Sequence, residues 1–93
     1  KFPRNQKFLL GDRLQSTALD VLERLVEATY TRQRDDLLRR ANLGVEKLRF
    51  LSRLALDLGH LDSRRYEHAA RNLDEVGRLI GGWRKVSGDA SSA

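Results

Sequence analysis

The chain has 93 residues, a formal net charge of +5 and no cysteine. This length fits one domain with a small core, and the lack of cysteine excludes a disulfide framework, a thiolate nucleophile and a cysteine zinc site. No apolar run approaches the roughly 20 residues that a membrane-spanning helix needs, so we expect a soluble protein of a reducing compartment, by default the cytoplasm.

The first predicted element is a helix over about residues 6–30. Apolar residues recur there at the spacing of one helix face. The side chains expected on its inner face are Leu10, Leu14, Ala18, Val21, Leu22, Leu25 and Ala28.

The second predicted helix covers residues 35–58 and ends at Gly59, a residue typical of a left-handed helix cap. Its expected inner face consists of Leu37, Leu38, Ala41, Val45, Leu48, Leu51, Ala55 and Leu58.

The third predicted helix covers residues 63–86, with Asp62 or Ser63 as its N-terminal cap. Its expected inner face consists of Tyr66, Ala69, Ala70, Leu73, Val76, Gly77, Ile80 and Trp83. The segment SGDASSA that follows, residues 87–93, has the composition of a disordered tail. No stretch alternates at period two, and the connections are short, so the fold class is all-α: an antiparallel up-down helical bundle over residues 1–86.

A second set of apolar residues lies on faces of these helices that should be polar. The set comprises Leu43, Phe50, Leu54 and Leu61 in the second helix and Leu19, Val26 and Tyr30 in the first. Isolated residues of this kind are ordinary surface scatter. Stripes at heptad spacing instead favour contact with another helix or another subunit, and hence a homo-oligomer.

The segment GRLIGGWRK carries three glycines, Gly77, Gly81 and Gly82, followed by Trp83, the only tryptophan. Each glycine inside a helix costs roughly 0.5–1 kcal/mol relative to alanine. Ala70, Gly77 and Gly81 share one narrow strip, which would let another backbone approach closely. The alternative is that Gly81 and Gly82 fray the helix end, although Trp83 still continues the amphipathic pattern.

The titratable residues do not point to catalysis. His60 falls in a turn and His68 lies away from the apolar face, and neither accompanies a plausible nucleophile. The acidic pairs Asp35/Asp36 and Asp74/Glu75 are explained by the helix macrodipole and by neighbouring arginines better than by Mg²⁺. We therefore predict a non-enzyme without metal or cofactor.

Basic residues form the more informative pattern. Arg64, Arg71, Arg78 and Lys85 recur every seven residues along one edge of the third helix, about 10.5 Å apart by helical rise. The second helix adds Arg49 and Arg53, one turn apart, and Arg39 and Arg40 near its start. Nearby carboxylates allow these arginines to be merely a salt-bridged surface. Taken together, the clusters favour binding to a nucleic-acid backbone rather than to bases, since no aromatic residues are interleaved.

Three longer segments carry a family resemblance. FPRNQKFLLGDRLQSTALDVLERLVEATY, LRRANLGVEKLRFLSRLALDLGHL and YEHAARNLDEVGRLIGGWRK resemble the Avd proteins, the accessory variability determinants of diversity-generating retroelements. That group is similar to a wider set of bacterial four-helix bundles that includes the proteins encoded in intervening sequences of 23S ribosomal RNA genes. The resemblance implies that the first of four helices is missing from these 93 residues and that the three present are the second, third and fourth.

The resemblance also implies a function. Avd proteins form a ring of five bundles with a basic surface and act, without catalytic activity, beside a retroelement reverse transcriptase and its template RNA, or an RNA/DNA hybrid. Carried over, Arg49 and Arg53 would contact the enzyme or nucleic acid, whereas Gly77, Gly81, Gly82 and Trp83 would be packing residues. The alternative is a structural or interaction bundle of the intervening-sequence type, with no specific nucleic-acid role.

Overall fold

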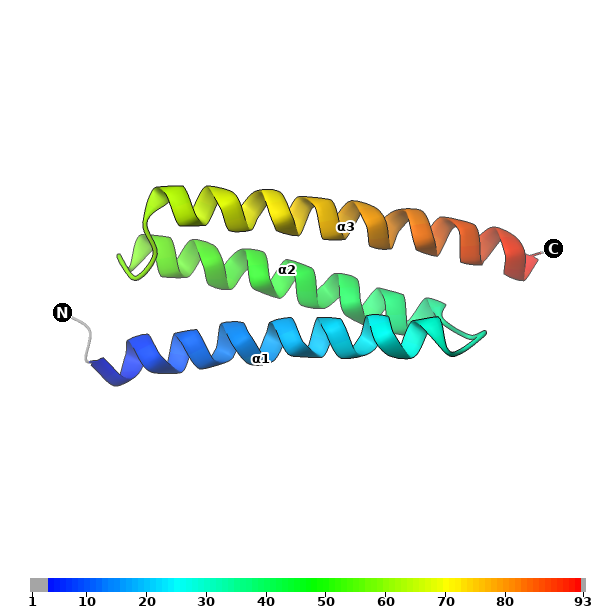
Figure 1. Ribbon diagram of the computed structural model, residues 1–93, viewed down its shortest axis with the longest axis horizontal. Coiled ribbons are helices and arrows are strands. Elements are labelled where there is room, and N and C mark those ends of the chain that lie inside the picture. Colours follow the sequence, from blue (N-terminus) through cyan, green and yellow to red (C-terminus); the bar gives the residue numbers. More distant parts are fainter. Residues whose placement is uncertain (1–3, 93) are drawn as a thin grey trace.

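Three antiparallel helices make up the computed structural model, which describes the backbone of residues 4–92 and the side chains of residues 8–86. They are α1 (Arg4–Thr29), α2 (Asp35–Asp57) and α3 (Ser63–Ser92), and residues 4–92 contain no strand. Figure 1 shows them side by side, with α2 between the two outer helices and the chain reversing its direction from each helix to the next. The predicted all-α up-down helical bundle is confirmed.

The C-terminal end of α3 differs from the prediction. The composition predicts a disordered tail over residues 87–93, but the structure continues α3 to Ser92. Extending a formed helix fixes one residue for each hydrogen bond gained, which is far cheaper than nucleating a new one. A polar segment can therefore prolong a helix that packing has already formed. Residue 93 and residues 1–3 of the predicted domain lie outside the described residues.

The core lies along α2. Within the described part of the chain, α1 and α3 each pack against α2 and not against each other. Eight apolar residues are buried: Val21, Ala28, Leu38, Ala41, Val45, Leu48, Ala55 and Ile80. Five of these belong to α2, because α2 is the helix with a neighbour on two sides.

The predicted inner faces of α2 and α3 are buried or half-buried throughout, but that of α1 needs correction. Ala18 is exposed and Leu22 is 56% exposed, although both were assigned to the inner face. Helix α1 meets α2 alone, so a narrow stripe of its surface is covered and the rest of the apolar face remains open. Thr17, a polar residue that the apolar pattern passes over, is buried at this contact with 6% exposure.

Local signals set the turn between α2 and α3. Gly59 has φ +77°, the left-handed conformation that glycine adopts without strain. The Gly59 amide donates to the carbonyl of Leu56, and the His60 amide donates to the carbonyl of Ala55. These are the two hydrogen bonds of a Schellman motif. The Asp62 carboxylate then accepts the Arg65 amide at 2.8 Å, which identifies Asp62 as the cap of α3.

Helices α1 and α2 approach closely at Gly44, which the sequence pattern does not single out. A Cβ added to Gly44 would overlap the side chain of Val21. At Gly77 an added Cβ would lie 3.2 Å from the Arg49 guanidinium, whereas at Gly81 and Gly82 it would meet nothing within 4 Å. Gly44 is therefore the glycine that a close helix contact within this chain requires.

Trp83 and its neighbours hold the C-terminal half of α3 against the start of α2. The Trp83 ring lies 5.7 Å from the Arg34 guanidinium, within cation–π distance. One residue further on, Arg84 pairs with Asp35 at 3.3 Å. These contacts explain why the amphipathic pattern resumes after the double glycine.

Candidate nucleic-acid interface

The predicted ladder on α3 is exposed along its length. Arg64, Arg71, Arg78 and Lys85 all lie on the surface. Arg71 is 3.9 Å from Glu67, and Arg78 forms an ion pair with Glu75 one turn earlier. Neither Arg64 nor Lys85 has an ion-pair partner among the residues whose side chains are described. The two ends of the ladder thus keep their full charge toward solvent.

Arg49 has a structural contact that the sequence does not reveal. Its guanidinium donates to the Asp74 carboxylate at 2.6 Å and lies 3.6 Å from Glu46. Asp74 belongs to α3, so this ion pair joins two helices and lies beside Gly77. Arg49 is 39% exposed, which leaves part of the group accessible to a partner.

Arg53 lies on the exposed surface one turn further along α2. It pairs with Asp57 at 3.2 Å. The Tyr66 hydroxyl, and after it the Asp57 carboxylate, raise the pKa of the Arg53 guanidinium above its ordinary value. Both contacts thus favour the charged form of Arg53.

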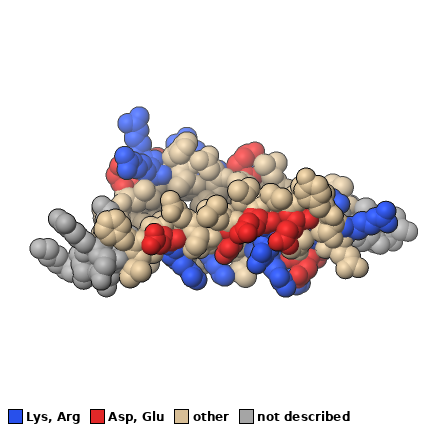
Figure 2. Space-filling view, turned by 60° about the horizontal axis from the view of Figure 1, so that its bottom comes forward, with Lys and Arg blue, Asp and Glu red and all other residues tan. Residues whose placement is uncertain are grey.

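Arg39 and Arg40 share one carboxylate. Both pair with Asp36, at 3.3 and 3.1 Å, in the first turn of α2. Six of the eight predicted cations are thus in ion pairs within the chain. Figure 2 gives the same picture on one face of the molecule, where Asp and Glu side chains run beside groups of Lys and Arg.

The carboxylates considered for Mg²⁺ are paired with arginines. Asp35 and Asp36 bind arginines of α3 and α2, and Asp74 and Glu75 bind Arg49 and Arg78. Across the described side chains, no three residues of metal-ligating type are grouped to hold a metal ion. His60 is half-buried in the turn after α2, and His68 is exposed on α3.

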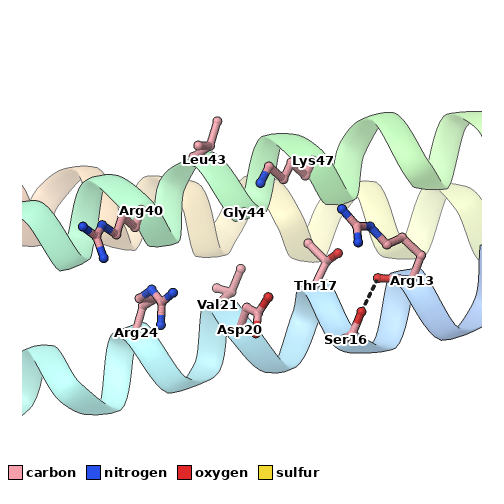
Figure 3. Close-up of a pocket in the computed structure, with 10 residues that line it drawn as sticks. All are labelled: Arg13, Ser16, Thr17, Asp20, Val21, Arg24, Arg40, Leu43, Gly44 and Lys47. Carbon is pink, nitrogen blue, oxygen red and sulfur yellow. Dashed lines mark hydrogen bonds between the residues drawn. The ribbon is translucent and has the colours of Figure 1, made fainter.

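A basic cleft between α1 and α2 brings together cations that the sequence reading did not assign to any site. Its volume is about 320 Å³. Figure 3 shows side chains of both helices directed into it. The lining residues are Arg13, Ser16, Thr17, Asp20, Val21, Arg24, Arg40, Leu43, Gly44 and Lys47. Of the predicted site residues, the cleft contains Arg40 and Leu43.

A signal for this cleft exists on each helix separately. Arg13 and Arg24 are 11 residues apart, which returns a helix to nearly the same face, and Arg40 and Lys47 are one heptad apart. The sequence does not show that these two pairs face each other. That depends on the register of α1 against α2, which is set by the contact between Val21 and Gly44.

Six of the seven predicted apolar contact residues are open to solvent, whereas Leu61 is half-buried and lies in the turn after α2 instead of on that helix. Exposure is 55% for Leu43, 79% for Phe50 and 45% for Leu54 on α2, and 57%, 51% and 87% for Leu19, Val26 and Tyr30 on α1. Four further large apolar side chains, which the sequence reading did not single out, are exposed as well: Phe8, Leu9, Leu79 and Val86. This chain alone therefore leaves much apolar surface uncovered.

The helices of residues 4–92 include none long and apolar enough to cross a membrane. Comparison with curated proteins and with solved structures finds no match. Comparison with protein families finds one described as bAvd-like, which matches residues 1–87 and so spans all three helices to the last turns of α3. The chain belongs to the bAvd-like family.

Proposed function

We propose that this chain is a non-catalytic accessory protein of a diversity-generating retroelement, which binds the reverse transcriptase and its template RNA to support mutagenic reverse transcription. The observation that carries the proposal is the family match over residues 1–87. An Avd-like family indicates an accessory role beside a retroelement reverse transcriptase. Binding of the enzyme and of RNA by this chain is the further step that we propose.

The charge of the chain supports an RNA partner. Lys and Arg number 18 against 13 Asp and Glu, and 14 of the 18 are arginines. A guanidinium stays charged at every relevant pH and matches the geometry of phosphate oxygens. Arg64 and Lys85 present unpaired charge on α3, and Arg71 and Arg78 are exposed between them.

The exposed apolar stripes support assembly. Phe50 and Leu54 lie one turn apart on the outer side of α2, and Leu43 continues the stripe seven residues earlier. Contiguous apolar surface of this kind on a small domain marks a protein interface. We propose that the stripe takes part in a homo-oligomer, a pentameric ring by analogy with the family, in the cytoplasm.

One observation favours a second candidate, a structural or interaction bundle without a nucleic-acid role. Arg39, Arg40, Arg49, Arg53, Arg71 and Arg78 are all paired with carboxylates of the same chain. Exposed pairs of this kind are weak, since each contributes at most about 1 kcal/mol. A phosphate can therefore displace the carboxylate at little cost, and the pairing does not argue strongly against RNA binding.

The deciding experiment is size-exclusion chromatography with light scattering on the full chain, alone and mixed with the reverse transcriptase. We expect a defined oligomer that co-elutes with the enzyme. The double substitution Phe50→Ser and Leu54→Ser should shift the protein from the oligomer to the monomer. Phe8→Ser, which replaces an exposed apolar residue on another helix, serves as the control. If the protein and the reverse transcriptase eluted separately, the accessory role would be contradicted.

RNA binding has a separate test, because the two candidates differ in their salt dependence. Each phosphate that the protein neutralises on a single strand adds about 0.7 to the slope of log affinity against log salt concentration. A steep slope with RNA supports the accessory protein. Weak binding with a slope near zero supports the structural bundle.

A further inference from the structure

The basic cleft between α1 and α2 has an excess of positive charge among its lining residues. Its lining holds four cations, Arg13 and Arg24 from α1 and Arg40 and Lys47 from α2, against one carboxylate, Asp20. Arg13 and Lys47 have no ion-pair partner among the described side chains. Arg24 is 4.0 Å from Glu27, and Arg40 shares Asp36 with Arg39. The positive charge of the cleft is therefore largely free for an anionic ligand.

The four cations form two pairs at opposite ends of the cleft. Figure 3 shows Arg24 opposite Arg40 at one end and Arg13 with Lys47 at the other. By helical rise, Arg13 and Arg24 are about 16 Å apart along α1, and Arg40 and Lys47 about 10 Å apart along α2. A ligand that contacts both pairs must extend over roughly that length.

The middle of the cleft distinguishes among anions. Asp20 lies between the two cation pairs along α1, so a compact anion at the centre would face a carboxylate. Thr17 and Val21 in the same region are only 6% and 7% exposed, so they add little accessible surface there. A ligand with separated negative charges fits this arrangement better than a single phosphate.

We infer that the cleft binds a single nucleic-acid strand along its length, with phosphodiester groups held by the cation pairs at its two ends. A strand in a helix carries one phosphate about every 3.4 Å of axis, so a length of 10–16 Å spans several phosphates. Those at the ends face the cations, and those at the centre must turn toward solvent, away from Asp20. Guanidinium groups bind such oxygens in pairs, whereas the Ser16 hydroxyl at this end already donates to the Arg13 carbonyl at 3.2 Å. Contacts of this kind position a strand without reading its sequence.

This inference rests on the proposed RNA-binding function and assigns it to a site other than the α3 ladder. Leu43 lines the cleft and also begins the exposed apolar stripe of α2. The strand would therefore run beside the surface that we propose for assembly.

The test uses the full chain and a fluorescein-labelled oligouridine RNA, with affinity measured by fluorescence anisotropy over a salt series. The variant carries Arg13→Gln and Lys47→Gln, two exposed residues whose replacement breaks no ion pair in the described structure. The control carries Arg32→Gln and Arg65→Gln, which remove the same charge from exposed positions outside the cleft. Circular dichroism melting of all three proteins verifies that they fold alike.

We expect the cleft variant to lose about 1.4 from the magnitude of its salt slope, the value for two single-strand phosphate contacts. Between roughly 50 and 200 mM salt, the wild-type protein would then lose about sevenfold more affinity than the variant. The control variant should keep nearly the wild-type slope.

Three outcomes would overturn the inference, and they separate it from the proposed function. Equal losses in the cleft and control variants would show that only net charge matters, while RNA binding by the wild-type chain would still stand. If the wild-type chain showed no salt-dependent binding of RNA, both the strand site in the cleft and the proposed RNA-binding function would be refuted. Competition by inorganic phosphate as effective as that by unlabelled oligouridine, lost in the cleft variant, would identify a small-anion site instead of a strand site.

Discussion

Replacing Gly44 by alanine probes the close contact between α1 and α2. The new Cβ would overlap the side chain of Val21, well inside the 3.5–4.0 Å at which carbon atoms normally touch. Val21 is 7% exposed and β-branched, and such a side chain has essentially one rotamer in a helix. It cannot swing away, so α1 must move relative to α2.

Two opposing effects set the size of the change. Overpacking a buried contact costs about 1–3 kcal/mol, and alanine recovers roughly 0.5–1 kcal/mol over glycine in a helix. The expected net loss in free energy of unfolding for Gly44→Ala is therefore between about 0 and 2.5 kcal/mol. For a domain of this size, each kcal/mol corresponds to about 4–8 °C in Tm.

Gly81→Ala is the matched control, because an added Cβ at Gly81 meets nothing within 4 Å. It should stabilise the chain by roughly 0.5–1 kcal/mol. Thermal and urea unfolding followed by circular dichroism measure both variants, and Val21→Ala in the Gly44→Ala background should recover part of the loss. If Gly44→Ala raised Tm as much as Gly81→Ala does, the close contact of α1 with α2 would be refuted. Destabilisation by Gly81→Ala would instead point to packing against another subunit.

Three further predictions follow from individual contacts. Arg49→Ala removes the ion pair with Asp74, and since both groups are partly exposed we expect a loss of at most about 1 kcal/mol, with a coupling of similar size in a double-mutant cycle with Asp74→Asn; zero coupling would mean that the pair contributes nothing. Asp62→Ala removes the cap of α3 and should cost about 1 kcal/mol in urea unfolding, whereas Asp62→Asn should cost much less. Gly59→Ala forces a side chain into the left-handed region and should cost about 1–2 kcal/mol, and an unchanged Tm would contradict the cap geometry.

Periodicity predicted the helices because each has a continuous apolar face, and it predicted the inner faces of α2 and α3 better than that of α1. Every residue assigned to the inner faces of α2 and α3 is at least half-buried. On α1 the same rule placed Ala18 and Leu22 inside, but Ala18 is exposed and Leu22 is 56% exposed. A sequence pattern gives the width of an apolar face but not the number of helices that cover it.

The local caps were also predictable, whereas contacts between helices were not. Gly59 and Asp62 act through backbone groups a few residues away, so the sequence contains everything that their roles require. The pair Arg49–Asp74 spans 25 residues, and the overlap at Gly44 depends on a residue of another helix. The sequence pattern pointed to Gly77 and Gly81 because they share a strip with Ala70, but within this chain an added Cβ at Gly81 meets nothing within 4 Å, whereas one at Gly44 overlaps Val21.

In the candidate site, too, features of a single helix were predictable from the sequence and contacts between helices were not. The ladder on α3 follows from a seven-residue repeat on one helix and is exposed as predicted. The cleft needs cations of α1 and α2 to face each other, and no single-helix pattern contains that information. The sequence predicted ion pairs for several arginines. The carboxylate with which each arginine pairs depends on how the helices pack.

The arrangement of the two outer helices around α2 determines how a change in α1 can affect α3. Because α1 and α3 do not touch within the described residues, any thermodynamic coupling between them must pass through α2. Substitutions on α1 and α3 that leave α2 unchanged should have additive effects on stability. A ligand in the cleft would therefore influence the arginine ladder on α3 only by displacing α2. If α2 is rigid, the two basic surfaces bind independently, and if α2 moves, binding at one surface affects the other.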